Sequence, residues 1–169
     1  FAEGMVIITS PGYKYEGEFK NNLYNGKGKL IYGNGDKFEG NFIDGRQEGF
    51  GVLIRGNGDK YEGGFKNGLP NGKGVLIYSN GDKYEGDFEN SEFSGQGVLT
   101  YREGIKYEGG FKKSKYEGKG TLTCPANCKD CPKKVTRGLW VGGKLLFDYD
   151  NEPVKNKKNT KKSSVPKNK

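Results

Sequence analysis

One stretch decides the fold of this chain: YEGGFKNGLPNGKGVLIYSNGDKYEG, residues 61–86. It begins and ends on the same triplet, Tyr-Glu-Gly, and the two copies stand 23 residues apart. The triplet recurs at that interval along the body of the chain, at residues 15–17, 38–40 (with Phe for Tyr), 61–63, 84–86 and 107–109. A constant period of this length is the signature of a repeat protein.

Further columns keep the same register. A phenylalanine follows four residues after each first ring, then comes a Gly-x-Gly pair, then a leucine, then in most copies a tyrosine. The columns are Phe19, Phe42, Phe65, Phe88 and Phe111; Leu30, Leu53, Leu76, Leu99 and Leu122; and Tyr32, Arg55, Tyr78, Tyr101 and Cys124.

The columns alternate at a spacing of two, which is the period of a β-strand. In the first repeat, Tyr15, Gly17 and Phe19 share one face of a strand, and residues 26–32 form the next strand. We expect a polar turn over residues 20–25 and a tight Asn-Gly hairpin turn at residues 34–35, with both central residues at positive φ. Since one hairpin is marginal alone, the sequence predicts an all-β fold of stacked antiparallel hairpins, with aromatic rings covering strand glycines.

Composition excludes several functions. The chain has 169 residues, 30 of them glycine, and no histidine, which removes His-based catalytic dyads and His-ligated metal sites. Residues 1–132 hold 18 Lys plus Arg and 18 Asp plus Glu, so the net charge of +8 lies in residues 133–169. The regular Lys-x-Glu columns read as a solvated ladder, because paired catalytic carboxylates must converge in a pocket. The sequence thus offers neither a His-based nor a paired-carboxylate catalytic site.

The ends depart from the period. We divide the chain into a partial repeat at residues 1–14, five full repeats at 15–123, a segment with a cysteine insertion, a partial sixth repeat and a cap at 124–150, and a disordered basic tail at 151–169. Residues 145–149 are the expected capping strand. The chain opens on Phe1, so we expect further residues upstream in the full-length protein.

The pattern Tyr-Glu-Gly-x-Phe-x-x-Gly, Gly-x-Gly-x-Leu-x-Tyr and Asn-Gly-Asp resembles the MORN repeat family over roughly residues 5–123, with a partial unit at 136–147. The departures are Asn22, Ser91 and Ser114 at a glycine column, Arg55 at a tyrosine column, and the insertion after Leu122. The resemblance implies an elongated, single-layer, twisted sheet (a MORN-type β-solenoid) with one grooved face. It also implies a non-catalytic scaffold for protein partners in cytoskeletal, ciliary or membrane-associated assemblies.

The aromatic columns carry the partner prediction. They are read either as rings that only cover one another, or as an exposed groove for a protein partner such as a helix. For the groove we name Tyr32, Arg55, Tyr61, Tyr78, Tyr84, Tyr101 and Tyr107. The family resemblance also implies a cytoplasmic protein that is associated with the cytoskeleton, a cilium or the inner face of a membrane. A targeting domain of a larger enzyme is a further alternative.

Three cysteines, Cys124, Cys128 and Cys131, stand in the insertion CPANCKDCP. They are read as free thiols of a reducing compartment, as palmitoylation sites, or as three zinc ligands that need a fourth from Asp130 or a second chain, and hence a homodimer. Apart from this zinc option, we expect no cofactor.

The tail lysines Lys155, Lys157, Lys158, Lys161 and Lys162 are candidates for contact with anionic phospholipid. They would make the chain a peripheral membrane module, which is the alternative function. Because no aromatic residues are interleaved with them, no nucleic-acid partner is expected.

Overall fold

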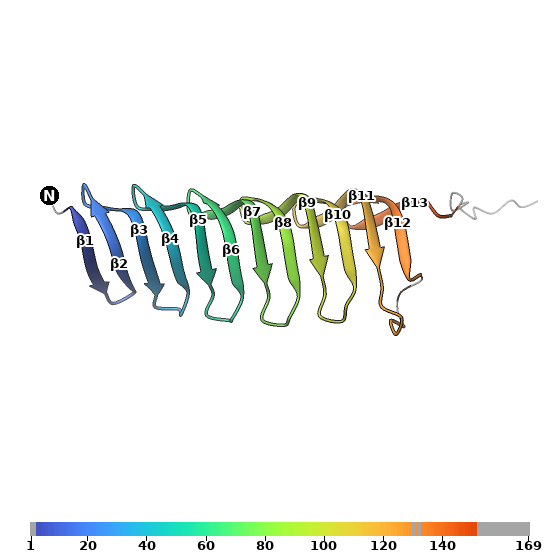
Figure 1. The fold of residues 1–169 in the computed structure, drawn as a ribbon, viewed down its shortest axis with the longest axis horizontal. Helices are drawn as coiled ribbons and strands as arrows, with labels where there is room; N and C mark the ends of the chain where they lie inside the picture. Colours follow the sequence, from blue (N-terminus) through green and yellow to red (C-terminus); the bar gives the residue numbers. More distant parts are fainter. Residues whose placement is uncertain (1–2, 130, 132, 152–169) are drawn as a thin grey trace, which may run out of the picture.

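Thirteen antiparallel strands in one open sheet make up this protein. The computed structural model describes residues 3–129, 131 and 133–151, and these residues contain no helix. Each strand pairs with the next in the chain, so the sheet order is the sequence order and the strands follow one another along the long axis (Figure 1). The strands are β1 Gly4–Ser10, β2 Tyr13–Lys20, β3 Leu23–Tyr32, β4 Lys37–Ile43, β5 Arg46–Ile54, β6 Lys60–Lys66, β7 Leu69–Ile77, β8 Lys83–Glu89, β9 Glu92–Thr100, β10 Lys106–Lys112, β11 Lys115–Thr123, β12 Val135–Val141 and β13 Lys144–Asp148.

This confirms the predicted all-β, single-layer sheet of stacked hairpins. A strand stands at each irregular end, with β1 pairing on β2 and β13 pairing on β12 near the predicted cap. The predicted disorder of the tail concerns residues that lie outside the described part, apart from Asn151.

The turn assignments need correction. The tight two-residue turn is not at Asn34–Gly35 but inside the segment expected as a longer polar turn, where Asn21 and Asn22 have φ of 51° and 62°. At the Asn-Gly-Asp segment only Gly35 has positive φ, because the loop is closed differently. The amide of Asp36 donates to Oδ1 of Asn34, and the amide of Tyr32 donates to the carbonyl of Asp36.

The core is a ladder of rings on one face of the sheet. Tyr61 packs edge-on against Phe65, with ring centroids 5.2 Å apart, and against Phe88 of the next hairpin at 4.8 Å. The same contacts continue through Tyr84, Phe111, Tyr107 and Trp140. Edge-to-face pairs contribute ~0.5–1.5 kcal/mol each beyond the area that they bury, and the repeated contact joins the hairpins into one body.

Glycine lets each first ring lie flat on the strands. A Cβ added to Gly74 would lie within 2.7 Å of the Tyr61 ring, so a side chain at this position would displace the ring. The Tyr61 hydroxyl then donates to the carbonyl of Gly64 at 2.8 Å, and Tyr15, Tyr84 and Tyr107 make the corresponding bond. The aromatic-over-glycine arrangement expected from the sequence is therefore present.

Candidate functional site

The site is built on an unbroken row of glycines that crosses the sheet from β2 to β12. Each member pairs with the glycine of the neighbouring strand: Gly17, Gly28, Gly40, Gly51, Gly63, Gly74, Gly86, Gly97, Gly109, Gly120 and Gly138. A register shift follows this row within each hairpin, as between Gly63 and Phe65. Such bulges bend strands, and here they recur at the same level of every repeat.

The face opposite the rings carries an open groove of about 1060 Å³ above this row. Its floor is bare backbone at glycines such as Gly63, Gly74, Gly86 and Gly97, and it extends from Phe50 to Tyr149. One strand pair spans ~9.6 Å, so the groove runs along several repeats.

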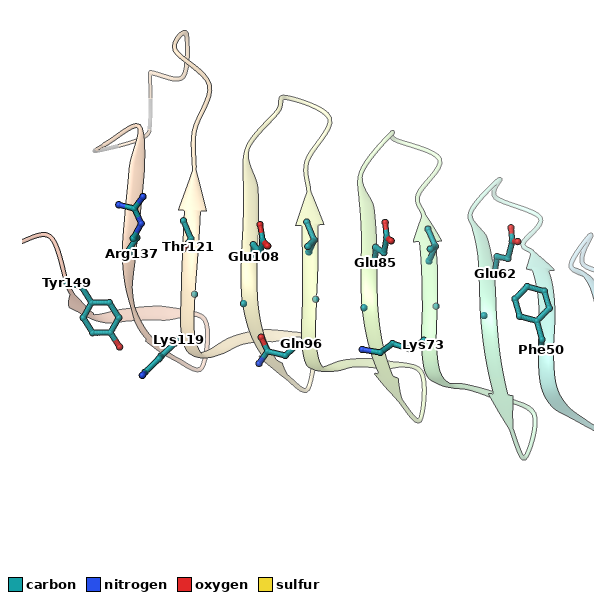
Figure 2. Close-up of a pocket in the computed structure, with 18 residues that line it drawn as sticks. Phe50, Glu62, Lys73, Glu85, Gln96, Glu108, Lys119, Thr121, Arg137 and Tyr149 are labelled. Atoms are coloured by element: carbon teal, nitrogen blue, oxygen red, sulfur yellow. The ribbon is translucent and has the colours of Figure 1, made fainter.

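One flank of the groove is a single cross-strand row in which acidic and uncharged side chains alternate. It runs Glu62, Val75, Glu85, Val98, Glu108, Thr121 and ends at Arg137. Figure 2 shows Glu62, Glu85 and Glu108 at the same level of successive even-numbered strands. The position that carries glutamate in the earlier repeats carries Arg137 in the last hairpin, so the charge of this flank reverses at its C-terminal end.

The other flank is less regular. Five strands, β3, β5, β7, β9 and β11, carry a Gly-x-Gly segment, and its middle residue is Lys27, Phe50, Lys73, Gln96 or Lys119. The last four of these residues line the groove (Figure 2). The Lys73 Nζ lies 2.6 Å from Oδ1 of Asp87 on β8. Hydrogen bonding to Lys73, together with the donated amide of Gln96, lowers the pKa of the Asp87 carboxyl. The Asp87 carboxylate is therefore ionised and is held by residues of the two neighbouring strands, β7 and β9.

The glutamates are paired along their own strands. Lys60 and Glu62, two residues apart, have their charged atoms 3.3 Å apart, and the pairs of Lys83 with Glu85 and Lys106 with Glu108 lie at 3.0 and 2.9 Å. All these side chains are about half exposed, and such pairs contribute only ~0–1 kcal/mol. The ladder predicted from the sequence is present, and it borders the groove.

The aromatic residues named for partner binding lie on the face of the sheet opposite this groove. Tyr61, Tyr84 and Tyr107 are at most 3 % exposed, because each is covered by rings of its own and the next repeat. They therefore belong to the core. Burial raises the pKa of Tyr61 and of Tyr107 to about 12.

The second named column lies beside the Asn-Gly-Asp loops, away from the groove. Tyr32 and Arg55 are exposed, and the Tyr32 hydroxyl accepts a hydrogen bond from Gln47. Tyr78 and Tyr101 are half-buried, and the Tyr101 hydroxyl is hydrogen-bonded to that of Tyr116 at 2.9 Å. Of the seven residues named, Arg55 and Tyr61 border a small cavity of about 40 Å³.

Sequence reasoning missed one packing column as well as the groove. Tyr24, Phe93 and Tyr116 stack on the first rings of their hairpins, at centroid distances of 3.8, 3.7 and 3.7 Å. The equivalent positions of the other two repeats are Gln47 and Pro70. Because the column mixes three kinds of side chain, identity alone does not reveal it.

The three cysteines come together in the loop between β11 and β12. The sulfur of Cys131 is in contact with those of both Cys124 and Cys128, and all three sulfurs lie within 4.8 Å of one another. Three separate free thiols are therefore not what the structure shows. Asp130, named as a fourth ligand, and the lysines named for lipid contact lie outside the described residues.

Comparison with known families agrees with this geometry. The family model of the MORN repeat matches five consecutive segments, residues 15–37, 38–60, 61–83, 84–106 and 107–129. The chain belongs to the MORN-repeat family. MORN repeats are in general non-catalytic modules that bind proteins or membranes. No curated protein matches the chain. Among the described residues, no helix has the length and apolar character that crossing a membrane requires.

Proposed function

We propose that this MORN-repeat chain is a non-catalytic scaffold that holds an elongated segment of a protein partner in its glycine-floored groove. The observation that supports this most directly is the groove itself, which has about 1060 Å³ and spans several repeats. The positions of the glycine row point toward the rings, so they leave bare backbone on the groove face, where the backbone or a small side chain of a ligand can approach closely. A long, narrow ligand suits it better than a compact one.

The spacing of the groove suits a helix. Successive repeats are ~9.6 Å apart, since each contributes two strands, and seven residues of an α-helix rise ~10.5 Å. A helix along the groove would therefore present one heptad to each repeat. Val75 and Val98 offer an apolar contact once per repeat, so the matching helix carries an apolar residue at every seventh position.

The charges define the rest of the partner. Each valine of the flank stands between two glutamates, as Val98 does between Glu85 and Glu108. Basic side chains flanking the apolar positions of the helix would meet these carboxylates, and an acidic one at its far edge would meet Lys119, which lines the groove. The placement in a cytoplasmic, cytoskeletal or ciliary assembly rests on the family resemblance and forms part of this proposal.

The test compares the two faces of the sheet. A partner is captured with the folded chain from cells that express it, and its affinity is measured against Val98→Glu in the groove and Tyr32→Ala on the opposite face. We expect Val98→Glu to weaken binding at least ~10-fold, because it sets a third carboxylate beside Glu85 and Glu108 and removes the apolar contact. Tyr32→Ala is expected to leave binding unchanged.

The opposite ranking would assign recognition to the exposed tyrosine column and sink the groove proposal. Circular dichroism of both variants checks that the sheet is retained. A photoactivatable cross-linker placed at position 50 in the groove locates the partner independently. It is expected to react with the partner if the partner lies in the groove, and not otherwise.

A further inference from the structure

The loop that carries the cysteines interrupts a regular link between neighbouring repeats. In the first three junctions the Asn-Gly-Asp loop is tied to the next loop by its aspartate. Oδ1 of Asp36 accepts from the amide of Gly56, that of Asp59 from Ser79, and that of Asp82 from Arg102. The fourth loop has Ile105 at this position, so the aspartate that makes this link is missing before the cysteine loop, and Glu103 of the same loop is paired with Arg102.

The cysteine loop is closed like the others but is longer. The amide of Cys124 donates to the carbonyl of Lys134 at 2.8 Å, just as that of Tyr78 donates to Asp82 in a regular loop. Nine residues, 125–133, lie within the closure, where the regular loop has three, 79–81. A longer loop without the aspartate link needs another source of order.

Three convergent sulfurs supply a candidate. Cys124 is buried and Cys128 and Cys131 are half-buried. The Cα of Cys131 lies 6.3 Å from that of Cys124 and 5.7 Å from that of Cys128. A disulfide would join only one pair and leave the third sulfur in contact but unused. A single ion at the centre of the cluster would use all three.

The surroundings suit a thiolate site. Thiolates are the form in which cysteine binds metal, and cations nearby favour that form. Lys129 lies beside Cys128 in the chain and is exposed, and exposed Lys134 closes the loop with Cys124. Lys133 is engaged elsewhere, 2.6 Å from Oδ2 of Asp148. Three thiolates and a divalent cation carry one net negative charge, and Lys129 and Lys134 belong to the same loop.

We propose that Cys124, Cys128 and Cys131 bind one zinc ion through three thiolates, with an exchangeable ligand such as water in the fourth position. Soft sulfur donors select zinc among the common divalent ions, and zinc accepts a tetrahedral set of three thiolates and one exchangeable ligand. The ion closes this longer loop upon itself and so orders the connection between β11 and β12, which lacks the aspartate link. Because the fourth position is open, the site is distinct from a closed structural centre with four protein ligands.

The test uses the whole 169-residue chain, purified under reduction and titrated with Zn²⁺ against a chelating indicator and with Co²⁺ as a spectroscopic probe. We expect one ion per chain, a thiolate-to-cobalt charge-transfer band, and release of protons on binding. We also expect bound zinc to raise the thermal midpoint, since it binds the folded state.

Two variants in the same loop sharpen the test. Cys128→Ser removes one ligand and is expected to weaken zinc affinity at least ~10-fold, since changes even outside the ligand set cost ~10–100-fold. Lys129→Ser keeps all three sulfurs and is expected to retain the stoichiometry of one ion. Protection of all three cysteines from alkylation by zinc, counted by mass spectrometry of the unaltered chain, stands even if a variant folds poorly.

Three results would overturn the proposal. One is the absence of zinc binding and of the cobalt band in the reduced chain. Another is unchanged affinity in Cys128→Ser. The third is alkylation of any of the three cysteines at the same rate with and without zinc. That result would show that this cysteine is not a zinc ligand.

Discussion

The two faces of this sheet are built on the same strands, yet they vary to different degrees from repeat to repeat. On the buried face, the first ring is Tyr or Phe in all five repeats, and the second ring is Phe in all five. On the groove face, the middle residue of the Gly-x-Gly segment is Lys, Phe, Lys, Gln and Lys in the five successive repeats. Both faces belong to the same strands, so the backbone cannot explain why residue types vary more on the groove face than on the buried face. Rings that must fit the next repeat tolerate little change, whereas groove side chains meet solvent and are free to specify a ligand.

Two phenylalanines on opposite faces give the strongest test of this comparison. Phe88 is 4 % exposed and packs against Tyr61, Tyr84 and Phe93, whereas Phe50 is 60 % exposed in the groove. Phe88→Ala is expected to lower the free energy of unfolding by ~4 kcal/mol, because it opens a cavity between two repeats. Phe50→Ala is expected to change it by no more than ~0.5 kcal/mol. Urea denaturation of both variants measures the difference, and equal losses would show that the faces do not divide stability in this way.

The glycine row gives the next largest effect. Gly74→Ala places a Cβ within 2.7 Å of several Tyr61 ring atoms, so the ring must leave its place, and we expect a loss of ~3 kcal/mol. The matched control is Gly12→Ala, where an added Cβ meets nothing within 4 Å and φ is not positive. Thermal unfolding of the two variants compares them. A loss at Gly12 as large as at Gly74 would mean that flexibility, not ring contact, explains the glycines.

Alkaline pH probes the buried tyrosines without mutation. Burial raises the pKa of Tyr61 to about 12, whereas an unfolded tyrosine titrates near ~10. The unfolded state therefore loses its proton first, so this contribution to stability is fully present below pH ~10 and is lost as pH rises toward 12. We expect the urea midpoint to fall over this range. Tyr61→Phe should flatten the fall while costing ~1 kcal/mol at neutral pH, because it removes the hydrogen bond to Gly64. An unchanged slope in this variant would contradict the assignment.

Most of the fold was predictable because it is periodic. The spacing of two within strands and of 23 between repeats places Tyr61, Phe65 and Leu76 on one face before any coordinates are known. The same argument groups Glu62 with Lys60 on the other face, and their ion pair is there. Periodicity tells which residues share a face, and that part of the prediction is confirmed.

Periodicity does not tell which face is open. Register shifts follow the glycine row beneath the groove, and such a bulge comes from pairing between strands rather than from either strand alone. Ring burial likewise needs stacking partners such as Phe93, whose column includes Gln47 and Pro70. The Asn-Gly signal was also misread, since a following aspartate binds the asparagine and widens the loop. All of these features depend on contacts between different columns of the repeat. The residue types within a single column do not predict such contacts.

The smallest expected change in stability separates recognition from folding on the groove face. Glu85 is exposed, and its only described ion pair is with Lys83 on the same strand, at 3.0 Å. Glu85→Gln keeps the size of the side chain and removes its charge, so we expect the free energy of unfolding to change by ~0–1 kcal/mol, and less at high salt. Binding of the captured partner is expected to weaken measurably, because the flank then lacks one carboxylate opposite the ligand. Glu39→Gln, in the same column but outside the residues that line the groove, is the matched control. If both substitutions leave binding intact, the acidic row serves solubility alone, and recognition must rest on the valines and the glycine floor.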